Sequence, residues 1–388
     1  PGLALFYGGM VRNGSVVATM MHSFLKLGIV SIIWVLWGYT LAFGSSINGF
    51  IGGLDFLNLS NVGPEPAGEG HTIPHLLFVT YQGMFAVITA AIITGSFAER
   101  VRLLPVLLFS VLWITLVYAP VAHWVWGGGW IATELEALDF AGGAVVHINS
   151  GVAGLVAALI LGRRVAVKGT QDFQPHNLPQ TILGASLLWF GWFGFNAGSA
   201  LAANGLAATA FINTNVAAAA GALLWCLVES IHKGKSTSLG VISGSIAGLV
   251  GITPAAGFVT PLAGIIIGGG AALCCYYAVA VLKPKLGYDD SLDAFGIHGV
   301  GGIWGAIATG VFATTSVNPD GADGLLYGNP DLMSAQILSV LAVIIYSAVL
   351  TYIIVQAIRL FMRFRVSEAE EQKGLDRLEH GEAGYSLS

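Results

Sequence analysis

Long apolar stretches, separated by short polar segments, run along nearly the whole chain. Most of them approach or exceed the roughly 20 residues that a helix needs to cross a bilayer, and they lack the alternation over about ten residues of a transmembrane β-strand. We therefore predict an all-α polytopic membrane protein with eleven transmembrane helices. The expected spans are residues 1–11, 16–43, 73–97, 103–121, 141–161, 180–200, 207–230, 239–257, 261–281, 295–314 and 332–361.

The two ends of the chain differ from the rest. Only eleven residues precede Arg12, and at 1.5 Å per residue they cover about half of a ~30 Å hydrocarbon core. We expect this first span to be truncated. The sequence becomes polar near its other end, so we divide it into a membrane domain over residues 1–366 and a tail over residues 367–388.

The composition agrees with a membrane location. Hydrophobic residues make up 55% of the chain and charged residues 10%, whereas an ordinary soluble domain is about 25% charged. This balance excludes a water-soluble fold. The cysteines lie inside apolar stretches, so no disulfide framework is indicated: Cys226, Cys274 and Cys275.

Basic residues gather on one side of the expected membrane. Of the 16 Lys and Arg residues, all but Lys26 follow odd-numbered spans. The positive-inside rule makes that side cytoplasmic, which places the amino terminus outside and the tail inside a cell (inner) membrane. The residues are Arg12, Arg100, Arg102, Arg163, Arg164, Lys168, Lys233, Lys235, Lys283, Lys285, Arg359, Arg363, Arg365, Lys373 and Arg377.

Lys26 is the exception, because it lies within the second span. An unpaired ammonium group is costly at that depth. We expect its amine to be neutral, to extend outward along its methylene stem, or to bond a carbonyl or hydroxyl group. A role in a pore is the alternative.

The outer side carries acids and no Lys or Arg. A surface of that sign concentrates cations, within the reach that salt screening allows. The acids are Asp55, Glu65, Glu69, Glu134, Glu136, Asp139, Asp320, Asp323 and Asp331.

Two histidines occupy matching positions in the pattern, since His147 lies in the fifth span and His298 in the tenth. An ionisable side chain inside the bilayer usually marks a solute path. Because five is an odd number, two five-span halves would form an inverted repeat, followed by one final helix, with the site near the midplane. We expect both imidazoles to be neutral and close enough to hydrogen-bond each other. Metal binding is not favoured, since neither has a cysteine or second histidine at ligand spacing.

The other histidines are expected to be packing or exposed residues. They are His22, His71, His75, His123, His176, His232 and His380.

Aromatic residues indicate a second feature near the outer side. Trp192, Phe195 and Ser199 share one helical face, and Tyr81 and Phe85 lie four residues apart near the outer end of the third span. Together with a tryptophan in the outer loop, Trp126, they would form an aromatic cage with a polar acceptor, which suits a small cation. The alternative for each tryptophan or tyrosine is the aromatic belt of a membrane interface.

Motifs of other function classes are absent from the sequence. It has no dinucleotide fingerprint after a strand, no P-loop, no H-E-x-x-H and no G-x-S-x-G. We therefore expect no enzyme activity, cofactor, metal site or nucleic-acid partner.

Several runs together strongly resemble the ammonium transporters (Amt/Mep/Rh), and the resemblance covers essentially the whole chain. The runs are FYGGMVR (6–12), AER (98–100), AHWVWGGG (122–129), LDFAGG (138–143), VHIN (146–149), PHNLP (175–179), GWFGFNAGS (191–199) and FGIHGV (295–300).

This resemblance implies a role for each candidate residue. Trp126, Ser199 and Phe85 would form an outer ammonium recruitment site, and Phe85 with Phe195 a stacked gate. Tyr81 stands where many members have phenylalanine and adds a hydroxyl group. The remaining roles implied are Trp192 in the pore wall, His147 and His298 as paired pore histidines, and Asp139 as a structural acid.

The resemblance also implies the activity and the partners. Family members are homotrimers in which each subunit has its own pore, and a trimeric PII-type nitrogen-signalling protein binds the cytoplasmic face. We expect ammonium, or methylammonium, to be recruited outside and deprotonated, and ammonia to pass along the histidines in the lipid bilayer. The alternative is an ammonium sensor that uses the same outer site. A transporter for another cation is not favoured, because it would need charged or thiolate ligands at the midplane and the sequence shows none beyond the two histidines.

Overall fold

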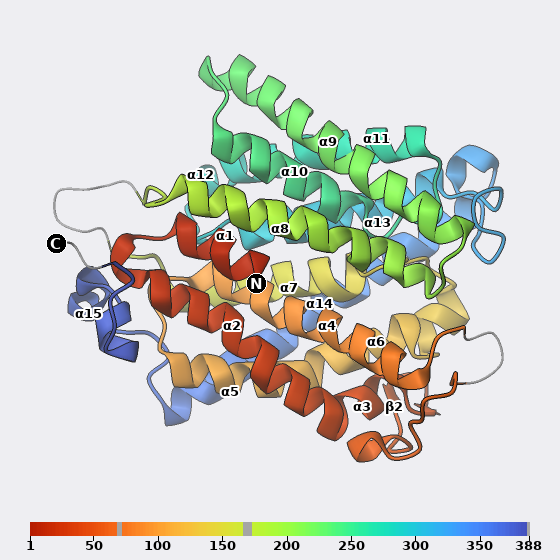
Figure 1. Cartoon of the computed structure of the whole chain (residues 1–388), viewed down its shortest axis with the longest axis horizontal. Helices are drawn as coiled ribbons and strands as arrows, with labels where there is room; N and C mark the ends of the chain where they lie inside the picture. The colour runs from red at the N-terminus through yellow and green to blue at the C-terminus, as the bar shows by residue number, and fades with distance from the viewer. Residues whose placement is uncertain (68–71, 166–172, 386–388) are drawn as a thin grey trace.

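The computed structural model describes residues 1–67, 72–165 and 173–385. Glu69, His71 and Lys168, which entered the sequence analysis, lie outside these residues. Helical segments occupy all eleven expected ranges and run roughly along the long axis of the molecule (Figure 1). The all-α prediction is therefore confirmed.

The first five helical runs lie in the first half of the chain. They are α1 (Gly2–Met10), α2–η2–α3 (Val16–Ile33, Trp34–Gly38, Tyr39–Phe43), α4–η4 (His75–Ile93, Thr94–Phe97), α5–η5–α6 (Leu103–Trp113, Ile114–Tyr118, Ala119–Trp126) and η7–α7 (Gly143–Ile148, Asn149–Leu161).

The other six follow residue 177. They are α8 (Leu178–Ala197), α9 (Gly205–Lys233), α10 (Ser238–Ile252), α11–η9–α12 (Pro261–Tyr277, Ala278–Leu282, Lys283–Leu286), η10–α13 (Phe295–Gly299, Val300–Phe312) and α14 (Pro330–Phe361). Within the described residues, eight helical runs are long and apolar enough to cross a membrane, and α1, α8 and α10 fill the other three expected positions.

Short elements lie at the two ends of the bundle. The connections hold η1 (Asn13–Ser15), η3 (Leu57–Leu59), η6 (Ile131–Leu135), η8 (Gly198–Ala200), η11 (Leu325–Tyr327) and an antiparallel hairpin of β1 (Ser46–Ile47) and β2 (Ile51–Gly52), in which Ser46 pairs with Gly52. The tail forms α15 (Glu368–Lys373) and η12 (Asp376–His380). We call the end with β1 and β2 the hairpin face and the end with α15 and η12 the tail face; Figure 1 shows them at opposite ends.

Side-chain caps explain where several helices begin. Asn177, Asn204, Thr237 and Thr260 each accept a hydrogen bond from a backbone N–H of the first turn of α8, α9, α10 and α11, and Asn329 does the same for α14. Such caps satisfy N–H groups that have no partner inside the helix. Proline at the start of α8, α11 and α14 fits these positions, because it has no N–H to satisfy.

Charged residues join the tail to the membrane domain. Arg365 pairs with Glu371 at 2.8 Å, and Arg102 pairs with Glu370 at 2.7 Å. The Asp376 carboxylate accepts the backbone N–H of two residues in the first turn of α2, at 3.1 and 2.9 Å. The tail is thus held against the loops of the tail face.

A second network links four loops on the same face. Buried Glu99 pairs with Arg12 and Arg164, both at 2.7 Å, and Arg164 also pairs with Asp289 at 2.9 Å. Burial alone would raise the pKa of the Asp289 carboxyl, but the hydrogen bonds and charge of Arg164 and the charge of Arg100 lower it to about 2. Asp289 therefore stays ionised.

Lys26 is completely buried between α2 and α5, and its Nζ donates to the carbonyl of Val106 at 3.4 Å. A bond to a carbonyl at a helix contact is one of the outcomes expected for this lysine. The side chain does not extend to the protein surface, and it does not line the pore described next.

Candidate pore

Three aromatic side chains meet near the hairpin face. Phe85 of α4 contacts Trp126, the last residue of α6, with ring centroids 5.6 Å apart, and contacts Tyr81 at 5.0 Å. Phe85 is buried, whereas Trp126 and Tyr81 are partly exposed. The structure thus brings Tyr81, Phe85 and Trp126 together. Trp192, which the sequence analysis also placed in the cage, contacts His147 instead.

Ser199 completes this group from the short helix η8. Its Oγ lies 3.0 Å from Tyr81 Oη, and it donates to the carbonyl of Phe195 at 2.9 Å. Tyr81 Oη donates to the same carbonyl at 2.7 Å. Because both hydroxyl hydrogens have acceptors at the end of α8, both oxygens keep lone pairs that can accept hydrogen bonds from a cation.

Asp139 positions the indole of Trp126 and the start of the fifth span. Its carboxylate accepts four backbone N–H groups of residues 142–145 at 2.6 to 3.3 Å. Its backbone carbonyl accepts the Nε1–H of Trp126 at 2.9 Å. Asp139 is therefore tied by hydrogen bonds to the backbone of the site.

On the side of the cage toward the tail face, the phenyl rings of Phe85 and Phe195 contact each other and block the path, with ring centroids 4.5 Å apart. On the far side of Phe195 lies the His147 imidazole, at 5.9 Å and nearly parallel to the phenyl ring. The indole of Trp192 stacks on His147 at 5.4 Å and is fixed by donating to Thr253 Oγ1 at 3.0 Å. Two aromatic rings thus pack against His147.

His147 and His298 are in direct contact, as expected from the sequence. Their Nδ1 atoms are 3.1 Å apart and their ring centroids 5.2 Å apart. His147 is 0% exposed and its Nε2 has no hydrogen-bond partner among the described residues, while His298 is 5% exposed. Among the described residues, no group of three or more His, Cys, Asp or Glu side chains is arranged to hold a metal ion.

The two histidines have matching local structure. Each lies in a π-helical turn, η7 or η10, that continues into an α-helix of 13 residues, α7 or α13. A residue with positive φ comes shortly before each turn: Gly142 at 113° and Asp293 at 59°. Wide π-helical turns are frequent at functional sites because they redirect a side chain.

Glycine allows the two helices to approach each other at this level. A Cβ on Gly151 of α7 would collide with the backbone of Gly299, and a Cβ on Gly302 of α13 would lie 3.0 Å from His147 Cβ. Only glycine fits such close backbone contacts, which are typical of helix packing in lipid. The imidazoles are therefore held together by the packing of their own helices.

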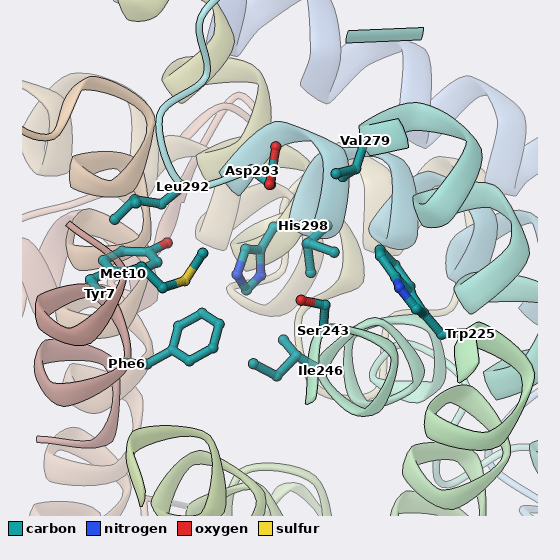
Figure 2. Close-up of a pocket in the computed structure, with 11 residues that line it drawn as sticks. Phe6, Tyr7, Met10, Trp225, Ser243, Ile246, Val279, Leu292, Asp293 and His298 are labelled. Carbon is teal, nitrogen blue, oxygen red and sulfur yellow. The ribbon is translucent and has the colours of Figure 1, made fainter. Parts of the chain in front are cut away.

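A small cavity of about 20 Å³ continues the path beyond His298. His298 lines this cavity, and Figure 2 shows its imidazole together with Phe6 of α1, Ser243 and Ile246 of α10 and Asp293. The volume is about that of one water-sized molecule. Most of the labelled side chains around it are apolar, so it accepts a small neutral solute more readily than a hydrated ion.

This cavity leads to a larger one at the tail face. Met10, Val279, Leu292 and Asp293 line both, and the larger cavity has a volume of about 740 Å³. Its rim carries Arg163, Arg164 and Lys283 together with Asp289. The order from the hairpin face is thus aromatic cage, phenyl pair, histidine pair, small cavity and charged vestibule.

The sequence analysis did not single out the residues on the tail side of the histidines. Phe6 could have been found, since it belongs to the FYGGMVR run. Ser243 and Ile246 lie in an apolar span that resembles its neighbours, so no local pattern marks them. Thr253, which fixes Trp192, likewise depends on a tertiary contact.

Comparisons with known proteins identify the architecture. The family model described as Ammonium Transporter Family matches residues 1–385. An ammonium transporter of Bacillus subtilis (strain 168) is 59% identical over 390 residues, which cover 100% of this chain and 95% of that protein.

Two solved structures are similar over most of the chain. Mep2 of Saccharomyces cerevisiae superposes with a TM-score of 0.88 at 39% identity, over 95% of this chain and 84% of that one. A structure described as a sensor Amt protein has a TM-score of 0.89 at 28% identity, over 98% of this chain and 94% of that one. The chain therefore belongs to the ammonium transporter family.

Proposed function

We propose that this transporter recruits ammonium at the aromatic cage, removes a proton from it and conducts ammonia past the two histidines. The observation that carries the proposal is the unbroken line of ring contacts Trp126–Phe85–Phe195–His147–His298, with centroid distances of 5.6, 4.5, 5.9 and 5.2 Å. This line leads from the hairpin face to the cavity beyond His298.

Recruitment uses the faces of the rings and the two hydroxyl oxygens. A cation beside Trp126 and Phe85 is attracted by their ring quadrupoles, with about 0.5–2 kcal/mol per contact. Ser199 Oγ and Tyr81 Oη, 3.0 Å apart, accept hydrogen bonds from its N–H groups. These contacts replace part of the water that the ion loses on entry.

The path beyond the phenyl pair favours a neutral solute. An intact charge there would be surrounded by buried phenyl and indole rings and by neutral imidazoles, at a high cost in desolvation. Deprotonation avoids this cost, and the released proton either returns outward or travels inward separately. Potassium has a similar size but no proton to release, so the same barrier rejects it.

The histidine pair provides hydrogen bonds in this apolar passage. Since one Nδ1 donates and the other accepts, the two rings are opposite tautomers, and their Nε2 atoms offer one acceptor and one donor. Ammonia is both a donor and an acceptor, so it can exchange hydrogen bonds with the rings as it passes. No covalent intermediate and no cofactor are required.

We also propose an orientation in the membrane and an assembly for this transporter. The tail face carries the basic residues and is cytoplasmic by the positive-inside rule, which places the amino terminus outside a cell (inner) membrane. The matched turns η7 and η10 support an inverted repeat. A homotrimer is proposed because the chain belongs to the ammonium transporter family, for which the resemblance implies that assembly.

We also propose that the tail face binds a trimeric PII-type nitrogen-signalling protein. The vestibule of about 740 Å³ with its basic rim is large enough to admit a protein loop and to attract its acidic groups. Retention of the host's PII protein by the purified transporter, under some nucleotide condition, is the expected result. Failure under every condition would remove this partner.

Flux of labelled methylammonium into liposomes that contain the purified protein tests the function directly. We expect saturable uptake, competition by ammonium and no uptake of potassium. A matched preparation of Phe195→Ala, which opens the phenyl pair, should change the flux while thermal unfolding shows a folded protein. A folded native protein that binds ammonium but gives no flux above empty liposomes would contradict transport.

That same outcome would favour the second candidate function, an ammonium sensor. The similarity to a solved sensor Amt protein is the observation that favours this alternative. A sensor would keep the cage and the two hydroxyl oxygens, because it also binds ammonium. Binding without flux therefore separates the two functions.

A further inference from the structure

The segment that precedes the fifth span has no regular secondary structure. Residues 136–142 lie between η6 and η7, outside any helix or strand. The backbone N–H and C=O groups of such a segment have no helical partners, so other groups must satisfy them wherever they are buried. Asp139 belongs to this segment, and its carbonyl oxygen accepts the Nε1–H of Trp126 at 2.9 Å. The position of the segment therefore decides where the indole of the cage lies.

Gln336 of the final helix, α14, holds this segment at Leu138. Its Oε1 accepts the Leu138 N–H at 2.7 Å, and its Nε2 donates to the Leu138 carbonyl at 2.9 Å. Nε2 also donates to the carbonyl of Ala306 in α13, at 2.9 Å. One side-chain amide thus joins the segment before η7 to two helices of the second half of the chain.

These contacts use the whole amide of Gln336. Both of its N–H bonds and its oxygen have a backbone partner, and the residue is 2% exposed. A buried polar group is costly unless it is hydrogen-bonded, and an apolar side chain of the same length would serve packing alone equally well. The backbone groups that it holds therefore explain the amide.

Leu138 and Asp139 present adjacent carbonyl oxygens to two different elements. The carbonyl of Leu138 accepts an N–H of Gln336 from α14, and the carbonyl of Asp139 accepts the indole N–H of Trp126 from α6. Only one peptide unit separates the two acceptors. A shift of Leu138 would therefore move the group that fixes the Trp126 ring.

We propose that Gln336 is a positioning residue for ammonium recruitment. It fixes Leu138 from α14 and, through the next peptide, the Asp139 carbonyl and the indole of Trp126, whose ring face attracts the cation. This inference rests on the proposed function of the cage. Gln336 does not contact the ion, because its amide has no N–H left and its oxygen is occupied.

The effect of Gln336 should concern recruitment rather than the conduction step. Its partner in α13, Ala306, lies about 12 Å along the helix from His298 at 1.5 Å per residue. The contact between His298 and His147 does not involve Gln336. We therefore expect the histidine pair to keep its geometry when the amide is removed.

Methylammonium flux into liposomes, measured over a range of concentrations, tests the proposal through the half-saturation concentration and the maximal rate. Gln336→Met has a similar length and no strong hydrogen-bonding group. We expect its half-saturation concentration to rise by roughly tenfold, with a maximal rate close to that of the native protein. The matched control is Gln356→Met in the same helix, whose amide contacts Arg359 near the tail face and which should behave like the native protein.

Gln336→Glu tests the same bonds by pH and does not depend on how the methionine variant folds. At about pH 5 the buried carboxyl group carries a proton, so it accepts the Leu138 N–H and donates to the Leu138 carbonyl, whereas at about pH 8 the ionised form cannot donate. Relative to the native protein, we expect its half-saturation concentration to be lower by about threefold at the lower pH. The titratable residues of the segment, Glu136 and Asp139, are present in both proteins, so the comparison cancels their effect.

Three outcomes would overturn the inference alone. They are a native half-saturation concentration in folded Gln336→Met, a loss confined to its maximal rate, and no relative effect of pH in Gln336→Glu. An absence of saturable flux in the native protein would overturn the proposed function, and this inference with it.

Discussion

His147 and His298 share one hydrogen bond between their Nδ1 atoms, which are 3.1 Å apart. Such a bond needs one donor and one acceptor, so it excludes a state in which both imidazoles are protonated at both nitrogens. It also makes the two rings chemically unequal, although they lie in matching helical turns. The two imidazoles therefore cannot both be cationic while they share this bond.

Removing one imidazole should slow ammonia conduction without unfolding the protein. His298→Ala leaves the buried Nδ1 of His147 without a partner, at a cost of about 1–3 kcal/mol, and it removes the polar wall of the small cavity. If this cost falls on the conduction step, flux drops by roughly 5- to 150-fold. Stopped-flow measurement of pH changes in liposomes gives the rate. Native flux in a folded His298→Ala protein would contradict the role of the pair.

Tyr81→Phe should weaken ammonium recruitment. The substitution removes the Tyr81 hydroxyl, which contacts Ser199 Oγ at 3.0 Å, and thus one of the two acceptor oxygens of the cage, while the ring contact with Phe85 remains. One hydrogen bond to a charged group contributes about 1.5–3 kcal/mol. We expect ammonium affinity, measured by calorimetry, to fall by at least tenfold, with a smaller loss for methylammonium, which has one N–H fewer.

The matched control for this change is Tyr327→Phe, at an exposed tyrosine in the short helix η11. It removes the same hydroxyl group from a residue with no contact to the cage and should leave the affinity unchanged. An equal loss in both variants, or no loss in Tyr81→Phe, would show that the hydroxyl oxygen of Tyr81 does not contact the ion.

Asp139→Ala should destabilise the cage and the fifth span together. The carboxylate accepts four backbone N–H groups, which would lose their partners at the start of η7. Loss of a helix cap usually costs about 0.5–2 kcal/mol, and four N–H groups place this case at the upper end. We expect a lower thermal midpoint in detergent and weaker ammonium binding, with a milder effect in Asp139→Asn, whose amide oxygen still accepts. Equal midpoints for all three proteins would contradict this role.

Much of the fold could be predicted from the sequence because its strongest signal is hydropathy. The boundaries of α14 and α7 follow the change from apolar to polar residues, and His147 and His298 stand out because ionisable residues are rare in such spans. No pattern in the sequence indicates the π-helical turns that bring their rings together. They depend on the close packing of Gly151 and Gly302, which is a tertiary feature.

The contacts of single polar residues were the hardest to predict. A bond to a carbonyl was one of several outcomes expected for Lys26, but that it is the carbonyl of Val106 depends on how α2 packs on α5. Asp376 caps α2 from a position 358 residues away from Ala18, which no local rule can indicate. Ser243 lies beside the pore because the side of α10 that carries this serine faces His298.

Asp289 should make the free energy of unfolding depend on pH in the acid range. Its pKa is lowered to about 2 by Arg164 and Arg100 against the opposing effect of burial, while an unfolded aspartate has a pKa of about 3.9. A depressed folded pKa stabilises the fold fully above about pH 4, and the contribution is lost as the pH falls toward 2. Asp289→Asn should therefore reduce the free energy of unfolding by about 2 kcal/mol at pH 7 and by about half as much at pH 3.

Chemical unfolding in detergent at these two pH values measures the difference. Asp331→Asn is the matched control, because Asp331 is exposed and has no ion pair among the described residues. It should have no effect at either pH. A gap between the native protein and Asp289→Asn that is the same at pH 7 and pH 3 would mean that the ion pair with Arg164 does not carry this stability.

His147→Asp should make the pore permeable to potassium. The imidazole packs against both Phe195 and Trp192, which also contact each other, whereas a shorter carboxylate adds a negative charge and leaves space for water. Both changes lower the cost of an intact cation inside the passage. His147→Asn is the matched control, since it leaves the same space without the charge and should not admit potassium. A folded His147→Asp protein that conducts ammonium at the native rate and still rejects potassium would show that selectivity does not depend on deprotonation.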